Sequence, residues 1–223
     1  MTVAAVILAP TTDAALADAL GQPRVRRLAD LAWSGGAMPV IVLAPDADGS
    51  VARALTGAEA IHAQPAPLET GPAGQMQRGI ELAIDDVRGT TAVLLWPADM
   101  AWVGPETVTS LIEAHGVQPD TMLRPVWRDE AGWPVLLPVA AAGALGTVGA
   151  GASPAAVVAA LAATLPTRTV DLGDPGVTHD TDTPYHEMPA YEGPPDPPAG
   201  HTHEWGEDVA TEAGLPPAPA QLD

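Results

Sequence analysis

Two residue types with distinctive chemistry are missing from this chain of 223 residues, which has no cysteine and no lysine. The absence of cysteine excludes a disulfide framework, a zinc site built on thiolates and a cysteine nucleophile. The absence of lysine excludes a Schiff base and any phosphate contact made by an ammonium group. Phenylalanine is missing as well, so the core must be built mainly from alanine, valine and leucine.

Positive charge is scarce, because 28 acidic residues stand against nine basic residues, all of them arginine, and the formal net charge is −19. Such a chain is expected to repel nucleic acids and anionic membrane surfaces. No apolar run approaches the ~20 residues of a membrane-spanning helix, and no charged segment followed by an apolar one begins the chain. We therefore expect a soluble, cytoplasmic protein that binds neither nucleic acid nor membranes.

Short apolar runs alternate with segments of helical periodicity along most of the chain. Continuous apolar runs are typical of strands buried on both faces, and strands that alternate with helices predict a parallel, doubly wound sheet. We therefore expect an α/β, Rossmann-like fold. Strands are expected at 3–9, 39–44, 59–62, 92–96 and 167–172, and helices at 14–20, 25–33, 51–55, 75–87 and 155–165 and from residue 105. Two further extended segments, 122–127 and 133–138, predict a β-hairpin insertion.

Asp99 is the first candidate site residue, because it directly follows the expected strand 92–96 and its terminating Pro97. In open α/β sheets the binding crevice lies at the carboxyl ends of the strands. A carboxylate there can hold a divalent metal ion, which in turn binds phosphates. The other interpretation is a loop acid at the entry to the helix that begins near Pro105. Spacing alone does not separate the two.

Two further segments carry candidate ligands. Asp180 and Asp182 are spaced so that one loop can direct both carboxylates at a single cation, although Asp182 or Thr183 can equally cap a turn. The glycine-containing loop 65–74 precedes a helix from Gln75 and can present backbone N–H groups to an anion. Without a Gly-Lys-Ser/Thr sequence, a plain connection is the simpler interpretation of this loop.

The composition changes after residue 188, which separates an expected domain at 1–188 from a tail at 189–223. The tail is rich in proline, glycine and acidic residues, and we expect it to be disordered and able to contact a protein partner. His201, His203 and Glu204 within it can bind a transition metal weakly, or be incidental residues of a solvated tail.

Several motifs stand in a characteristic order: the first strand with its loop, then Gly21-Gln-Pro23, Gly74-Gln-Met76, Leu95-Trp-Pro-Ala-Asp99, Arg124-Pro-Val-Trp127, Gly132-Trp-Pro-Val135 and Asp180-Thr-Asp-Thr-Pro184. This order resembles the MobA-like nucleotidyltransferases, and most closely the molybdenum cofactor cytidylyltransferases. The resemblance spans about residues 3–187 and depends on the order of the segments, not on any single motif.

The resemblance implies a Rossmann-like domain that uses Mg²⁺ to transfer a nucleotide from CTP or GTP to a molybdopterin-like acceptor that carries a phosphate. It implies that Asp99 binds the metal, although the proline of the family's Asp-x-Pro motif is absent here. Asp180 and Asp182 match the family's closing motif. The contacts to nucleotide and acceptor would fall on six residues: Gly74, Gln75, Arg78, Gly132, Trp133 and Pro134. Trp133 stands where the family has histidine.

The departure from the family lies in the loop after the first strand. The family has a glycine-rich loop with an arginine and a lysine there, whereas this chain has Pro10-Thr-Thr-Asp13 and no basic residue before Arg24. Nucleotidyl transfer depends on stabilising charge, and each lost donor typically costs about 100-fold or more in rate. Arg24, Arg26 and Arg27 are candidates to replace the missing charges, but they begin a helix and the sequence does not place them.

Two functional hypotheses remain open at this point. The first is a working Mg²⁺-dependent nucleotidyltransferase with an altered phosphate loop. The second is a non-catalytic relative that keeps the fold and binds a protein partner or a small molecule. Because fold does not imply function, the geometry of the site must decide between them.

Overall fold

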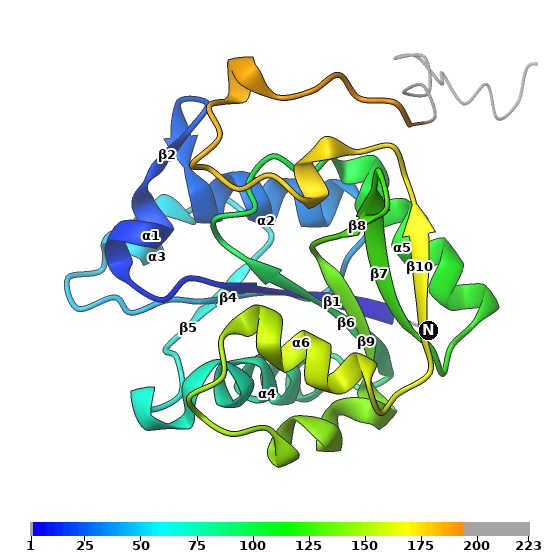
Figure 1. The fold of residues 1–223 in the computed structure, drawn as a ribbon. Helices are drawn as coiled ribbons and strands as arrows, with labels where there is room; N and C mark the ends of the chain where they lie inside the picture. Colours follow the sequence, from blue (N-terminus) through cyan, green and yellow to red (C-terminus); the bar gives the residue numbers. More distant parts are fainter. Residues whose placement is uncertain (1, 194–223) are drawn as a thin grey trace, which may run out of the picture. The chain divides into compact units, whose positions relative to one another are not determined.

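A computed structural model of the chain describes residues 2–193. His201, His203 and Glu204 of the tail, for which the sequence allows both weak metal binding and an incidental role, lie outside this range. The described residues form an eight-stranded sheet and a separate two-stranded ribbon (Figure 1). The strands are β1 (Thr2–Leu8), β2 (Asp18–Ala19), β3 (Gln22–Pro23), β4 (Val40–Leu43), β5 (Ile61–Ala63), β6 (Thr90–Pro97), β7 (Met122–Trp127), β8 (Glu130–Ala131), β9 (Val135–Pro138) and β10 (Thr167–Asp171).

The main sheet has the strand order β10-β7-β9-β6-β1-β4-β5, with β8 paired to β7. β1 pairs in parallel with β4 on one side and with β6 on the other, and the pairs β4–β5 and β7–β10 are parallel too. β9 runs antiparallel to both of its neighbours, β6 and β7. The prediction of a mostly parallel, Rossmann-like α/β sheet is confirmed.

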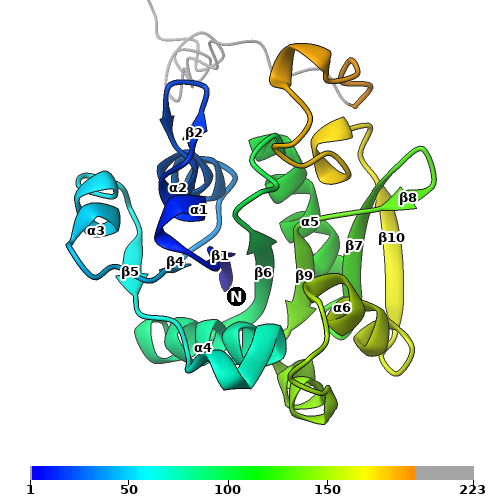
Figure 2. The same cartoon turned by 60° about the vertical axis from the view of Figure 1, so that its left-hand side comes forward.

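Helices cover both faces of this sheet, α2 and α5 on one face and α4 and α6 on the other (Figures 1 and 2). Side chains of a strand alternate between faces, and β1 sends Val3, Ala5 and Ile7 into one apolar cluster and Ala4 and Val6 into the other. The helices are α1 (Thr12–Leu16), α2 (Arg24–Ser34), α3 (Ser50–Ala54), α4 (Gly71–Asp86), α5 (Pro105–Val117) and α6 (Pro154–Ala162), with 3-10 turns η1 (Leu68–Thr70), η2 (Val139–Thr147), η3 (Pro175–Val177) and η4 (Tyr185–Glu187).

The expected hairpin forms, and its strands belong to the main sheet. β7 and β9 pair antiparallel, and the short β8 pairs with the end of β7. Val135, the first residue of β9, lies beside Leu95 of β6. The segment before Val135 therefore lies at the same edge of the sheet as the end of β6.

The first expected helix, 14–20, is wrong in its second half. α1 ends at Leu16, and residues 18–23 form the ribbon β2–β3 instead. Leu20 and Gly21 have positive φ values of 57° and 82°, as the two central residues of a type I′ hairpin turn do. The carboxylate of Asp18 accepts the N–H of Gly21 at 3.4 Å. The local turn geometry thus overrides the helical pattern.

No helix within residues 2–193 combines the length and the apolar character needed to cross a bilayer.

The packing of α4 on the sheet can be tested at Gly79, because a Cβ atom at this position would collide with the side chain of Val6 on β1. We expect Gly79→Ala to lower the free energy of unfolding by about 1–3 kcal/mol, because overpacking forces the helix away from the strand. Gly143→Ala is the matched control, because its Cβ would meet open space. Urea denaturation of both variants measures the difference. Equal stability of the two would contradict this packing.

Candidate functional site

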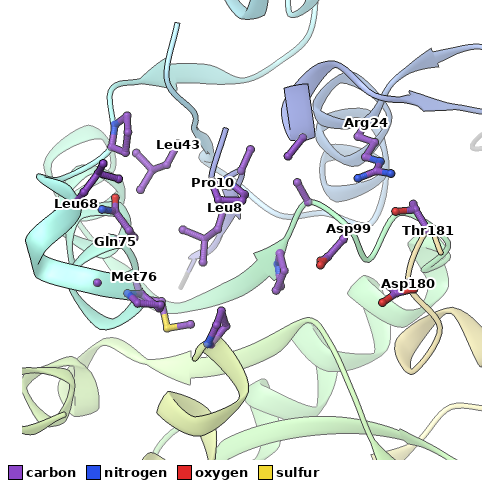
Figure 3. Close-up of a pocket in the computed structure, with 18 of the residues that line it drawn as sticks. Leu8, Pro10, Arg24, Leu43, Leu68, Gln75, Met76, Asp99, Asp180 and Thr181 are labelled. Carbon is purple, nitrogen blue, oxygen red and sulfur yellow. The ribbon is translucent and has the colours of Figure 1, made fainter. Parts of the chain in front are cut away.

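The cleft of the molecule lies where the order of the strands reverses. From β1 the chain proceeds outward to β4 and β5, and α4 then leads it back to β6, on the other side of β1. In such sheets ligands bind at this switch point, outside the carboxyl ends of the strands. A cleft of about 480 Å³ opens there, and it is lined by the last residues of β1, β4 and β6, which are Leu8, Leu43 and Pro97 (Figure 3).

One end of the cleft is apolar. Leu8, Leu43, Leu68 and Met76 line it together (Figure 3). Leu68 lies on the short η1 turn and is 83% exposed, although it is a large apolar side chain. This end therefore presents a surface that an apolar or planar ring can cover.

Gln75 lines the cleft but holds the neighbouring loop with its side-chain amide. The amide nitrogen donates to the carbonyl of Ala66, and the amide oxygen accepts the N–H of the same residue, each at 2.8 Å. Both polar atoms of the amide are therefore engaged with the loop that precedes α4. Gln75 therefore holds this loop in place at the wall of the cleft, as two backbone hydrogen bonds between neighbouring strands would.

The other end of the cleft is charged. Asp99, Asp180, Asp182 and Arg24 line it, although they come from three distant parts of the sequence. Figure 3 shows Arg24, Asp99 and Asp180 together, away from Leu68 and Gln75. The structure thus brings the three candidate metal-binding acids to one place. It also places the guanidinium of Arg24 there, which the sequence alone could not locate.

Backbone hydrogen bonds fix the acidic loop against the end of β6. The N–H of Thr181 donates to the carbonyl of Asp99 at 2.9 Å. The indole N–H of Trp102 reaches two carbonyls of the same loop, those of Asp180 at 3.0 Å and Thr183 at 2.9 Å. The carboxylate of Asp180 also accepts the N–H of Asp182 at 2.9 Å. The loop is therefore tied to Trp102 and Asp99 at several points.

Partial burial and neighbouring charges shift the pKa of Asp99. Partial burial by the cleft walls raises the pKa of Asp99 above its ordinary range, and the negative charges of Asp180 and Asp182 raise it further. A hydrogen bond from its own backbone and the positive charge of Arg24 oppose these effects. A cation next to Asp99 would favour the ionised carboxylate, which is the behaviour expected of a metal ligand.

The donor set fits a metal site that is completed by a ligand. Within residues 2–193, no group of three histidine, cysteine, aspartate or glutamate side chains is arranged to hold a metal ion by itself. Mg²⁺ is usually bound through one or two carboxylates together with substrate phosphates and water. Asp99 with one neighbouring acid supplies that number of carboxylates.

The loop after β1 presents little polar surface to the cleft. Pro10 lines the cleft, whereas the hydroxyls beside it serve the fold. The side chain of Thr11 accepts the N–H of Ala14 at 3.0 Å and caps α1, and Thr12 donates to the carbonyl of Pro45 at 2.7 Å. The two hydroxyls are therefore engaged within the fold, and the loop contains no basic residue that could contact an anion in the cleft.

Two predicted nucleotide contacts on α4 do not line the cleft. Gly74 faces the side chain of Thr70, which a Cβ atom at this position would overlap. Arg78 lies one turn further along α4 and is exposed. Of the three residues predicted on α4, Gln75 alone is among those that line the cleft.

The predicted acceptor segment Gly132, Trp133 and Pro134 also lies outside the cleft lining. The N–H of Gly132 donates to the carbonyl of Pro125, and the N–H of Trp133 donates to that of Val177, both at 2.8 Å. Because the segment immediately precedes β9, it nevertheless lies at the same sheet edge as Asp99. The structure places it beside the site, with Trp133 packed between the two apolar clusters.

Phenylalanine at position 102 keeps an aromatic ring but lacks the indole N–H that donates both hydrogen bonds. We expect Trp102→Phe to loosen the loop 180–183, since each lost hydrogen bond contributes about 1 kcal/mol. Backbone amide exchange in this loop should become about 10-fold faster or more. Trp33→Phe is the control, because Trp33 is 44% exposed on α2. Unchanged exchange at 180–183 in Trp102→Phe would show that the indole does not hold the acidic loop.

Comparisons with known proteins identify the fold and the family. Solved structures with the same fold include a nucleotidyl transferase from Methanothermobacter thermautotroptrophicus, with 18% identity, a TM-score of 0.60, and coverage of 76% of this chain and 87% of that one. The manganese complex of Rv0371c from Mycobacterium tuberculosis H37Rv has 18% identity, a TM-score of 0.55, and coverage of 77% and 87%.

A third structure is CMP:2-keto-3-deoxy-manno-octonic acid synthetase complexed with CTP, with 14% identity, a TM-score of 0.56, and coverage of 77% of this chain and 90% of that one. None of the curated proteins matches the chain. The family model of the MobA-like NTP transferase domain matches residues 11–165, which is more than half of the chain. The chain therefore belongs to the MobA-like NTP transferase domain family.

Proposed function

We propose that this protein binds a nucleoside triphosphate together with a divalent cation in the cleft and transfers its nucleotide to an acceptor that carries a phosphate. The observation that supports this most directly is the convergence of Asp99, Asp180, Asp182 and Arg24 at the switch point of the sheet. A metal-binding acid and a cation at the strand ends, next to an apolar wall, match the charged and the planar parts of a nucleotide.

The divalent cation that we propose is Mg²⁺, held by Asp99 with Asp180 or Asp182. When bound, such an ion supplies neutralisation of negative charge on the phosphates. The chain's own residues position the ligand: the apolar wall around Leu43 and Met76 excludes water from the ring of the nucleotide. Similar folds with manganese and with CTP, in the two proteins described above, support this pair of ligands.

For the acceptor we propose a molybdopterin-type molecule with a terminal phosphate, as the resemblance of the sequence to the cytidylyltransferases implies. The segment Gly132, Trp133 and Pro134 is the proposed acceptor side. Support for this assignment comes from its place beside β6, at the edge of the sheet where Asp99 lies.

A second candidate function is non-catalytic binding of a nucleotide, a small molecule or a protein partner. The observation that favours it is the loop after β1, where Pro10 faces the cleft and Thr11 and Thr12 are committed to hydrogen bonds within the fold. With few groups to stabilise developing charge on a triphosphate, ligand binding can persist while transfer is lost.

Nucleotide binding is tested by thermal unfolding with CTP and with GTP, in the presence and absence of Mg²⁺. A ligand at one hundred times its Kd should stabilise the wild type by about 2.7 kcal/mol. Asp99→Asn should abolish the Mg²⁺-dependent part of this stabilisation. Asp85→Asn is the matched control, because it makes the same charge change at an exposed position near the end of α4.

The two candidates are then separated by pyrophosphate release with a molybdopterin acceptor. Release by the wild type and its loss in Asp99→Asn would support transfer, whereas stabilisation without release would support the non-catalytic function. If neither nucleotide stabilises the wild type at millimolar concentration, the proposal of nucleotide binding fails.

A further inference from the structure

Arg24 occupies an unusual position for a cation. It is the first residue of α2 and directly follows the β2–β3 ribbon, where its backbone N–H donates to the carbonyl of Ala17 at 2.9 Å. Positive charge at a helix N-terminus is unfavourable, because it faces the positive end of the helix dipole. The side chain nevertheless lies in the cleft, near Asp99 (Figure 3). The helix dipole therefore does not favour a cation at this position.

The guanidinium of Arg24 is poorly satisfied within the fold. Its Nε atom is fully buried and has no hydrogen-bond partner, and none of its nitrogens forms an ion pair with a described acid. The neighbouring arginines differ. Arg26 pairs with Asp30 at 2.8 Å, and Arg27 donates to the carbonyl of Ala101 at 2.9 Å. A buried donor without a partner costs free energy, so hydrogen bonds and ion pairs to described residues do not account for the position of this guanidinium.

The charges of the cleft give Arg24 a specific task. Three acids line the charged end, and Arg24 is the sole basic residue among the described residues that line the cleft. The chain has no lysine, and the loop after β1 offers no cation. A polyphosphate that enters this end would be repelled by the acids unless a metal ion and Arg24 offset their charge. A guanidinium is well suited to this, since its planar fork matches phosphate oxygens.

We propose that Arg24 binds the phosphate groups of the ligand, and that α2 thereby supplies the cationic contact that the loop after β1 lacks. This inference rests on the proposed function for the identity of the complete ligand, but it specifies a polyphosphate anion as the group that Arg24 contacts. The metal ion, held by Asp99, and the guanidinium of Arg24 would then both contact the polyphosphate.

The test uses two probes, inorganic tripolyphosphate and CTP, each with Mg²⁺, and measures Kd by isothermal titration calorimetry. Arg24→Met keeps the apolar stem and removes the guanidinium, and it should weaken binding of both probes by about 10- to 100-fold. Arg24→Lys should restore part of the affinity, because it keeps the charge but not the fork. Arg88→Met is the matched control, since Arg88 is exposed in the turn before β6, at the opposite end of that strand.

Each outcome decides the inference. If both probes bind the wild type and bind Arg24→Met equally well, Arg24 is not a phosphate contact and nucleotide binding stands without it. If tripolyphosphate binds in an Arg24-dependent way but CTP does not bind, Arg24 is the anion contact and the proposed nucleotide function fails. If neither probe binds the wild type, both proposals are refuted. Thermal melting without ligand shows whether Arg24→Met is folded, and Arg24→Lys carries the test if it is not.

Discussion

A backbone hydrogen bond, from the N–H of Thr181 to the carbonyl of Asp99, joins the two halves of the charged site. Some eighty residues of chain separate these groups. This bond, together with the two that the Trp102 indole donates to the same loop, holds Asp180 and Asp182 beside Asp99. Asp174 continues the same connection, because its buried carboxylate accepts hydrogen bonds from the N–H of Gly104 at 2.9 Å and from Thr107 at 2.7 Å, at the start of α5. The closing segment is therefore fastened at both ends of the loop that follows β6.

The site that results has an excess of negative charge, which shapes its chemistry. Three carboxylates lie at one end of the cleft. Partial burial is the main cause that raises the pKa of Asp99, and the charges of Asp180 and Asp182 raise it further. Asp99 forms no ion pair with a described residue. The positive charge of Arg24 acts on it only at longer range. A titratable group in a cleft whose pKa is shifted by burial and by neighbouring charges is typical of functional sites.

The sequence predicted the parts of the fold that depend on apolar patterning, and failed where local geometry or long-range contacts decide. The parallel strands around β1 follow from continuous apolar runs, and the position of Asp99 follows from its place at the end of such a strand. The ribbon β2–β3 was missed because its turn depends on the positive φ of Leu20, which the residue type does not suggest. Arg24 could not be placed, because it directly follows that ribbon and its backbone N–H is bound to the carbonyl of Ala17 across it.

The central claim is that a divalent cation and a polyphosphate meet between Asp99 and Arg24. It is tested most directly by anomalous diffraction from crystals grown with Mn²⁺ and CTP, since manganese marks its own position. The account predicts an anomalous peak within coordination distance of the Asp99 carboxylate, with the triphosphate between that peak and the guanidinium of Arg24. A manganese peak bound elsewhere, or a triphosphate that contacts neither residue, would contradict it.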